Sequence, residues 1–160
     1  MKKTLLLQMI ISISLLLSCP QVHFAATDAD KGRPIVEEQI WKLEEAYFTS
    51  LYNADHDAVL VLVHEQFLGW PDVVSKPLDR QGSSDFMKKA FSKPLPCSLK
   101  FVREGIRVIG DVALTQYILS TRCSDVTGAA EERSSRITHT WVKRGSAWKL
   151  LGGMSIGIER

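Results

Sequence analysis

Histidine and cysteine are scarce in this chain, which has four histidines and three cysteines among 160 residues. One histidine lies in the apolar N-terminal segment, and His56, His64 and His139 do not have the spacing of metal ligands. His64-Glu65 begins a zinc-protease motif, but Leu68 occupies the position of its second histidine. We therefore predict no metal site and no cofactor.

The chain also lacks a glycine-rich phosphate loop, a linker rich in Gly, Ser or Pro, and an internal repeat. It contains 20 basic and 18 acidic residues, and loss of Lys2 and Lys3 with a cleaved leader would leave 18 of each. A neutral chain without a basic run has no electrostatic reason to bind nucleic acid. About 134 residues would then remain, enough for one domain with a single core.

A long apolar run occurs at the N-terminus. Two lysines precede mostly Leu and Ile residues from Thr4 to Leu17, and small residues follow from Ala25 to Ala29. This order is typical of a bacterial secretory signal, which we assign to residues 1–26. The chain is therefore expected to be exported to the periplasm or beyond the cell; a membrane anchor is the alternative, although the run is short for a bilayer.

The cleavage site has two readings. Small residues near Ala25 to Ala29 predict release of a soluble protein. Alternatively, Leu16-Leu17-Ser18-Cys19 is similar to a lipoprotein box, in which Cys19 would be acylated and anchored. After the signal segment, residues 27–33 are expected to form a flexible leader, and residues 34–158 a single domain.

The first half of that domain has helical spacing. Pro34 suits a first helical turn, and Ile40, Leu43, Tyr47 and Leu51 form one apolar face. A short second helix is expected at about 57–64, a brief strand at 66–70, and a loop at 73–81. Ser83 or Ser84 can cap a third helix.

The second half has strand-like alternation. Segments 98–109 and 112–123 pair across Gly110-Asp111, and segments 132–143 and 147–158 pair across Gly145. The order helix, helix, strand, helix and then four strands predicts an α+β domain. Its antiparallel sheet buries one face beneath three helices.

Cys97 and Cys123 are predicted to form a disulfide. A three-residue connection at 109–111 would pair Val108 with Val112 and place the two cysteines opposite one another. Export to an oxidising compartment favours the bond. Alternatively, a two-residue Gly110-Asp111 turn would shift the register by one and leave two unpaired thiols.

The pattern resembles the nuclear-transport-factor-2-like superfamily, which includes ketosteroid isomerase, SnoaL-type polyketide cyclases and many exported proteins of unknown function. The residues that carry the resemblance are Glu38–Ile40, Ala46–Leu51, Asn53–Asp55, Phe67–Trp70, Arg136–Gly145 and Ala147–Leu150. The resemblance implies a cone, made of a curved antiparallel sheet with helices packed on its concave face and a pocket at the wide end. It also implies a homodimer formed through the outer face of the sheet.

Ketosteroid isomerase uses a carboxylate base and hydrogen-bond donors for an oxyanion. Tyr47, Asp72 and His139 are the residues that could take such catalytic roles here. Each has a structural alternative: Tyr47 as a core residue, Asp72 as an exposed loop residue, and His139 as a half-buried strand residue.

A binding pocket requires less than catalysis. Its walls could be formed by Trp70, Tyr117, His139, Trp141 and Met154, although the same set could form an ordinary core. Three functions follow as hypotheses: a protein that binds a small apolar ligand, an isomerase or cyclase-like enzyme that transfers a proton beside a carbonyl, and a protein–protein interaction module.

Overall fold

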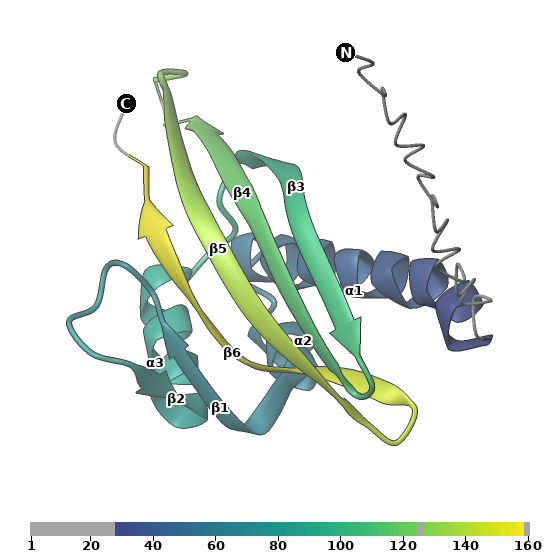
Figure 1. The fold of residues 1–160 in the computed structure, drawn as a ribbon. Coiled ribbons are helices and arrows are strands. Elements are labelled where there is room, and N and C mark those ends of the chain that lie inside the picture. Colours follow the sequence, from purple (N-terminus) through teal and green to yellow (C-terminus); the bar gives the residue numbers. More distant parts are fainter. Residues whose placement is uncertain (1–27, 125–126, 159–160) are drawn as a thin grey trace, which may run out of the picture.

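The computed structural model describes residues 28–124 and 127–158. Three helices and six strands occur in this part of the chain (Figure 1). The helices are α1 (Asp28–Tyr52), α2 (His56–Leu62) and α3 (Arg80–Ala90). The strands are β1 (Val63–Trp70), β2 (Leu78–Asp79), β3 (Cys97–Ile109), β4 (Val112–Ser124), β5 (Ala130–Arg144) and β6 (Ala147–Gly157).

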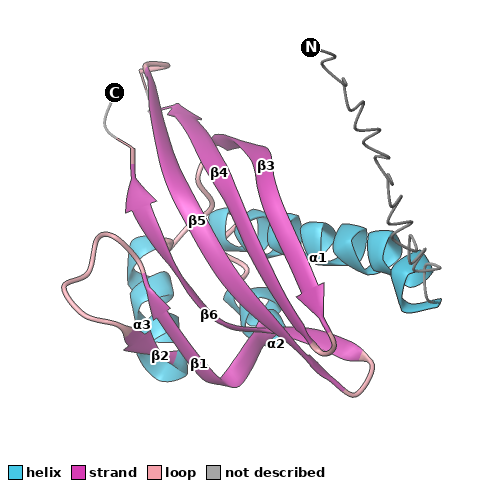
Figure 2. Ribbon diagram, in the orientation of Figure 1, coloured by secondary structure: helices cyan, strands magenta, loops and turns pink. Residues whose placement is uncertain are grey.

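The strands form one open sheet in the order β2-β1-β6-β5-β4-β3, with all three helices on one of its faces (Figure 2). β3, β4, β5 and β6 form an antiparallel meander. The predicted α+β cone is thus confirmed. The sheet is mixed, however, because β1 pairs parallel with β6, with Val63 opposite Leu150 and Trp70 opposite Met154.

The core lies between the helices and the concave face of the sheet. Strand residues that point inward alternate with exposed ones, as the pleat requires. Trp141, Leu150 and Trp148 from the strands pack with Ile40 and Val59 from the helices. No helix within the described ranges is long and apolar enough to cross a membrane.

Three element boundaries differ from those expected. The predicted flexible leader, 27–33, is helical from Asp28 onward, and Pro34 lies inside α1 and not in its first turn. α3 begins at Arg80 because Asp79, not Ser83 or Ser84, caps it by accepting from the Gly82 amide. Within the expected loop, Leu78 and Asp79 pair with β1.

Of the two turns considered for the β3–β4 hairpin, the three-residue turn used to align the cysteines is wrong and the two-residue turn is present. Ile109 pairs with Val112 across a two-residue turn in which Gly110 has φ +56°. A bulge between Arg103 and Gly105 then shifts the register by one. This second shift returns Cys97 to a position opposite Cys123.

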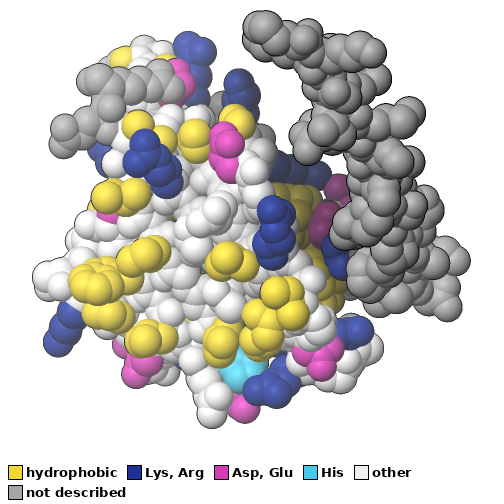
Figure 3. Space-filling view, in the orientation of Figure 1, with side chains coloured by type: hydrophobic (Ala, Val, Ile, Leu, Met, Phe, Trp, Pro, Cys, Tyr) yellow, Lys and Arg dark blue, Asp and Glu magenta, His cyan; other side chains and the backbone are white. Residues whose placement is uncertain are grey.

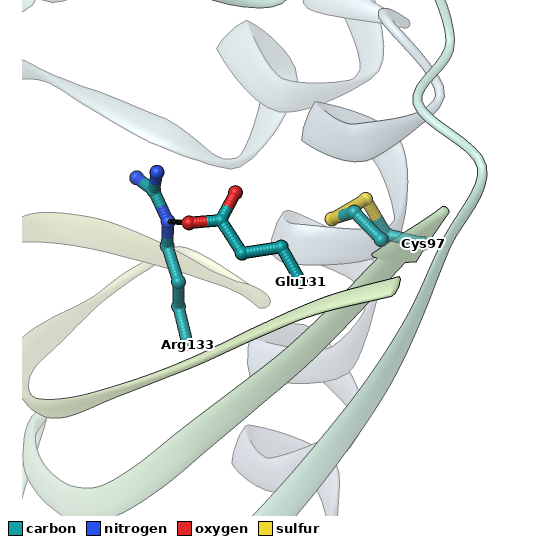
Figure 4. Close-up of a disulfide and its surroundings, with 4 residues drawn as sticks. Cys97, Glu131 and Arg133 are labelled. Atoms are coloured by element: carbon teal, nitrogen blue, oxygen red, sulfur yellow. Dashed lines mark hydrogen bonds and ion pairs between the residues drawn. A yellow bond between two sulfur atoms is a disulfide. The ribbon is translucent and has the colours of Figure 1, made fainter. Parts of the chain in front are cut away.

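Cys97 and Cys123 form a disulfide at the far end of this hairpin (Figure 4). The bond spans 26 residues, and a loop of that length predicts a stabilisation of about 3 kcal/mol. A Cys97→Ser/Cys123→Ser double variant is therefore expected to lower the free energy of urea unfolding by about 3 kcal/mol relative to the oxidised protein. Reduced wild-type protein is the control and should match the variant; a reduced protein as stable as the oxidised one would contradict the prediction.

Candidate functional site

A cavity of about 310 Å³ opens between the helices and the wide end of the sheet. Aromatic side chains form much of its wall, among them Tyr47 and Phe48 from α1, Phe86 from α3 and Phe91 at the C-cap of α3. The sheet contributes His139 and Ile137 from β5 and the backbone of Gly153 from β6. An apolar hollow with a few polar groups is the usual form of a small-molecule site.

A buried carboxylate lies behind this cavity. Glu44 is fully buried on α1, where it occupies the sheet-facing side together with Ile40. Its Oε1 accepts hydrogen bonds from Thr115 Oγ1 at 2.5 Å and Trp141 Nε1 at 2.7 Å. Its Oε2 accepts from the Tyr117 hydroxyl at 2.8 Å and lies 2.7 Å from His139 Nδ1. Side chains from two adjacent strands thus satisfy one helical carboxylate.

The charge on Glu44 is stabilised by these donors. Burial alone would raise the pKa of its carboxyl, but the His139 charge and hydrogen bonds from His139, Thr115 and Trp141 hold that pKa below its ordinary value. Burial, together with the Glu44 charge, raises the pKa of the Tyr117 and Tyr47 hydroxyls. Both tyrosine hydroxyls therefore keep their protons.

His139 connects Glu44 to the cavity. Its ring packs parallel to Phe48, with a centroid separation of 5.9 Å, and edge-on to Tyr47 at 5.6 Å. On the sheet side it lies against Gly153, where a Cβ would come within 2.4 Å of His139 Cδ2. Glycine at 153 therefore leaves the space that the imidazole occupies.

The mouth of the cavity is more polar. Trp70 donates its indole N–H to the Val74 carbonyl, and the Asp72 amide donates to Ser155 Oγ. Arg133 also lines the cavity and forms an exposed ion pair with Glu131 at 2.7 Å (Figure 4).

The three residues predicted to be catalytic all line this cavity. Tyr47 and His139 lie close together within it, whereas Asp72 is exposed at the mouth, with Oδ2 directed toward Gly157. Their catalytic roles stay predictions. Among the residues predicted to bind a ligand, Trp70, His139 and Met154 line the cavity. Tyr117 and Trp141 instead lie beneath it as Glu44 donors.

Glu44 was missed by sequence reasoning. A signal was present, because Glu44 falls between Ile40 and Tyr47 on the apolar face of the first helix. A carboxylate at such a position requires partners, since a buried charge is retained only when it is paired or hydrogen-bonded. Within the described ranges, no group of three or more His, Cys, Asp or Glu side chains could hold a metal ion.

This architecture defines the class of protein: a nuclear-transport-factor-2-like cone whose helices and sheet enclose a pocket. An NTF2-like protein from Cytophaga hutchinsonii is similar, with 17% identity, a TM-score of 0.59, and 76% of this chain and 98% of that chain covered. A ketosteroid isomerase-like protein from Erwinia carotovora atroseptica is also similar, with 13% identity and a TM-score of 0.63. That similarity covers 76% of this chain and 95% of the Erwinia chain. The cone fold that the resemblance implied is therefore confirmed.

Residues 36–152 match the family model of the calcium/calmodulin dependent protein kinase II association domain, and the chain belongs to this family. The association domain of C. elegans CaMKII is similar in structure, with 17% identity and a TM-score of 0.69. That similarity covers 81% of this chain and 98% of the C. elegans chain. No curated protein matches the chain in sequence.

Proposed function

We propose that the protein binds a small, mainly apolar ligand in the cavity between the helices and the sheet. The observation that carries this proposal is the 310 Å³ hollow itself, which is lined by aromatic rings and reached from the mouth at Trp70 and Asp72. A volume near 300 Å³ is at the lower end of small-molecule sites. The ligand is therefore about the size of a molecule with one to three rings.

A cavity-filling substitution tests this proposal. Ser135 is partly buried on β5 and lines the cavity, so Ser135→Trp places an indole in the space that a ligand needs. Titration with the apolar fluorophore N-phenyl-1-naphthylamine should show saturable binding to wild type and at least tenfold weaker binding to the variant, because the two rings compete for one volume.

Arg136 is the matched control position. It follows Ser135 on β5, is exposed, and points to the opposite face of the sheet. Arg136→Trp should therefore bind the fluorophore as wild type does. Equal loss in both variants, or no binding to wild type, would contradict a ligand site in the cavity.

A second function, self-association through the outer face of the sheet, is favoured by a separate observation. Exposed apolar side chains occur on β1, β3, β4 and β6, where they alternate with buried residues. They are Leu68, Val102, Leu114 and Ile156. Figure 3 shows hydrophobic side chains at several places on this face of the molecule. Apolar side chains gathered on one face are typical of an interaction surface, and an association domain is what the matched family is named for.

Light scattering on purified protein tests self-association. Wild type is expected to have the mass of a dimer or larger assembly, and Leu114→Glu/Ile156→Glu the mass of a monomer, because charges would be buried in the interface. Ile35→Glu is the control, since Ile35 is 75% exposed on α1 and lies away from the sheet. A monomeric wild type at high concentration would contradict this function.

Export to the periplasm or the cell exterior is also part of the proposal. The Cys97–Cys123 disulfide supports it, because such bonds persist in oxidising compartments. The predicted signal segment and Cys19 lie outside the described residues. Intact mass spectrometry on protein from the envelope of its own host would show cleavage near Ala25 to Ala29, or an acylated Cys19; an uncleaved cytoplasmic protein would overturn export.

A further inference from the structure

A second hollow, the α2 hollow, lies beside α2 and shares no lining residue with the aromatic cavity. Its volume is about 700 Å³. Three basic side chains line it, and each comes from a different element: Arg80 begins α3, Arg144 ends β5, and Lys149 lies on β6. The fold thus brings together charges that are far apart in the sequence.

These three cations are not neutralised by carboxylates. In the part of the chain that the structure describes, none of them forms an ion pair. Asp57 and Glu65 also line the α2 hollow, so it holds three positive and two negative side chains. The hollow therefore keeps an excess of positive charge and of hydrogen-bond donors.

Stabilising α2 uses only a small part of these donors. Arg80 donates to the Leu60 carbonyl at 3.3 Å, and Lys149 donates to the Val61 carbonyl. Both carbonyls lie in the last turn of α2, where the helix dipole favours cations. A guanidinium has five N–H donors and an ammonium has three, so most donors of the two side chains stay available.

His64 is independent evidence that an acceptor is missing here. It is 4% exposed and lines the α2 hollow. Its Nδ1 lies 3.0 Å from the Gln66 amide nitrogen, and its Nε2 lies 3.1 Å from Arg144 Nε. Both neighbours are N–H donors, whereas an imidazole carries one N–H of its own when neutral and two when charged. In every protonation state, one N–H is therefore directed at another N–H.

An anion in the α2 hollow would supply the missing acceptor. An oxygen beside the imidazole Nε2 and the Arg144 guanidinium would accept from both, while Nδ1 accepts from the Gln66 amide. A phosphate offers several such oxygens, and a guanidinium can bind two of them at once. The hollow has room for more than a phosphate, and its remaining wall is aliphatic, formed by Leu60, Val61 and Val63.

We propose that the α2 hollow binds a small phosphate monoester, whose phosphate is held by Arg80, Arg144 and Lys149 and whose organic group contacts the aliphatic wall. This adds a second ligand to the proposed function and does not depend on the aromatic cavity. Because the positive charges exceed the negative ones by only one, the hollow suits a single phosphate and not a polyanion.

Removing one of the three cations tests this site. Arg144→Gln keeps a donor but loses the charge, and it is expected to bind propyl phosphate about tenfold more weakly than wild type, the loss typical of one charge-assisted hydrogen bond. Calorimetric titration at low ionic strength measures both affinities, since salt screens exposed charges. Binding of N-phenyl-1-naphthylamine should be the same in Arg144→Gln and wild type, because Arg144 does not line the aromatic cavity.

Lys143→Gln is the matched control. Lys143 precedes Arg144 on β5, is exposed, points to the opposite face of the strand and does not line the α2 hollow. The substitution removes the same charge at nearly the same place, and affinity for propyl phosphate should match that of wild type. No binding of propyl phosphate to wild type, or equal losses in the two variants, would overturn the proposal.

Two further measurements locate the anion. In NMR spectra of histidine-labelled protein, the His64 ring signals, identified with the His64→Gln variant, should shift as propyl phosphate is added. Ser135→Trp should bind propyl phosphate as wild type does, because it fills only the aromatic cavity. Unchanged His64 signals, or loss of binding in Ser135→Trp, would overturn a site in the α2 hollow. Arg80→Gln, with the same expected loss, replaces Arg144→Gln if that variant does not fold.

Discussion

Glu44→Ala is expected to lower the free energy of unfolding by about 4 kcal/mol, because it leaves buried donors without their acceptor. Thr115, Tyr117, His139 and Trp141 all direct a polar hydrogen toward this one carboxylate. The Glu44 side chain is fully buried. A loss of this size is a large part of the stability of an ordinary domain. Urea unfolding followed by tryptophan fluorescence measures it.

Glu45→Ala is the control for this prediction. Glu45 is the next residue of α1 but carries its charge near the surface, where it forms an ion pair with Arg103 at 3.0 Å. Exposed pairs of this kind contribute about 0 to 1 kcal/mol. Similar losses of unfolding free energy in the two variants would show that the Glu44 hydrogen bonds stabilise the fold little more than an ordinary surface ion pair does.

The same network makes stability depend on pH in a defined direction. The folded protein holds the pKa of Glu44 below its ordinary value of 4.5, so the unfolded chain takes up the proton more readily. The stabilisation is therefore fully present above that ordinary value and is lost as the pH falls through the folded pKa. The difference in unfolding free energy between wild type and Glu44→Gln should accordingly narrow in acid.

Gly152→Ala is expected to have the second largest effect, a loss of about 3 kcal/mol with local separation of β1 from β6. A Cβ at 152 would lie 2.1 Å from the Leu68 carbonyl oxygen, which is backbone and is held by the sheet. The two strands must therefore move apart at the register where Leu68 faces Gly152. Hydrogen exchange of the β1 amides measures the separation.

Gly105→Ala is the matched control in the same sheet. A Cβ there would have no atom within 4 Å, and its backbone is not in the left-handed region. The free energy of unfolding of Gly105→Ala should therefore stay within about 0.5 kcal/mol of the wild-type value. If Gly152→Ala were equally well tolerated, the close approach of β6 to β1 would not be a constraint on this position.

Most elements of the fold could be predicted from local sequence patterns. The alternation of apolar and polar residues predicted the four long strands of the meander. Gly110 and Gly145 indicated the turns between them, and both adopt positive φ in the structure. The apolar face of α1 was also visible, because Ile40 and Leu51 repeat at helical spacing. Such features depend on neighbours within a few residues and can be read from the chain alone.

Relations between distant segments could not be predicted in the same way. The parallel pairing of β1 with β6 has no local signature, and the short strand at Leu78–Asp79 exists only because β1 is beside it. The pairing of Cys97 with Cys123 was predicted correctly, but from a turn that is not present. The two-residue turn and the bulge each shift the register by one residue, and the two shifts cancel. Neither shift alone would have placed the cysteines opposite one another.

The candidate site was predicted in part for the same reason. Tyr47, His139 and Trp70 were identified from their residue types and do line the cavity. Glu44 was not, because its bond to His139 joins residues separated by 95 positions. Nothing near Glu44 in the sequence shows that two strands will bring four donors to it.

The parallel contact between β1 and β6 also governs the order in which the molecule can be assembled. β1 has its long neighbour in the last strand of the described chain, so its edge is unpaired on that side until residues near Leu150 have been synthesised. During translation the helices likewise lack most of the sheet that covers them. Folding of this sheet must therefore await synthesis of β6, because long-range pairings form late and slowly. A chain that stays unfolded while it grows remains competent for threading through a translocation channel.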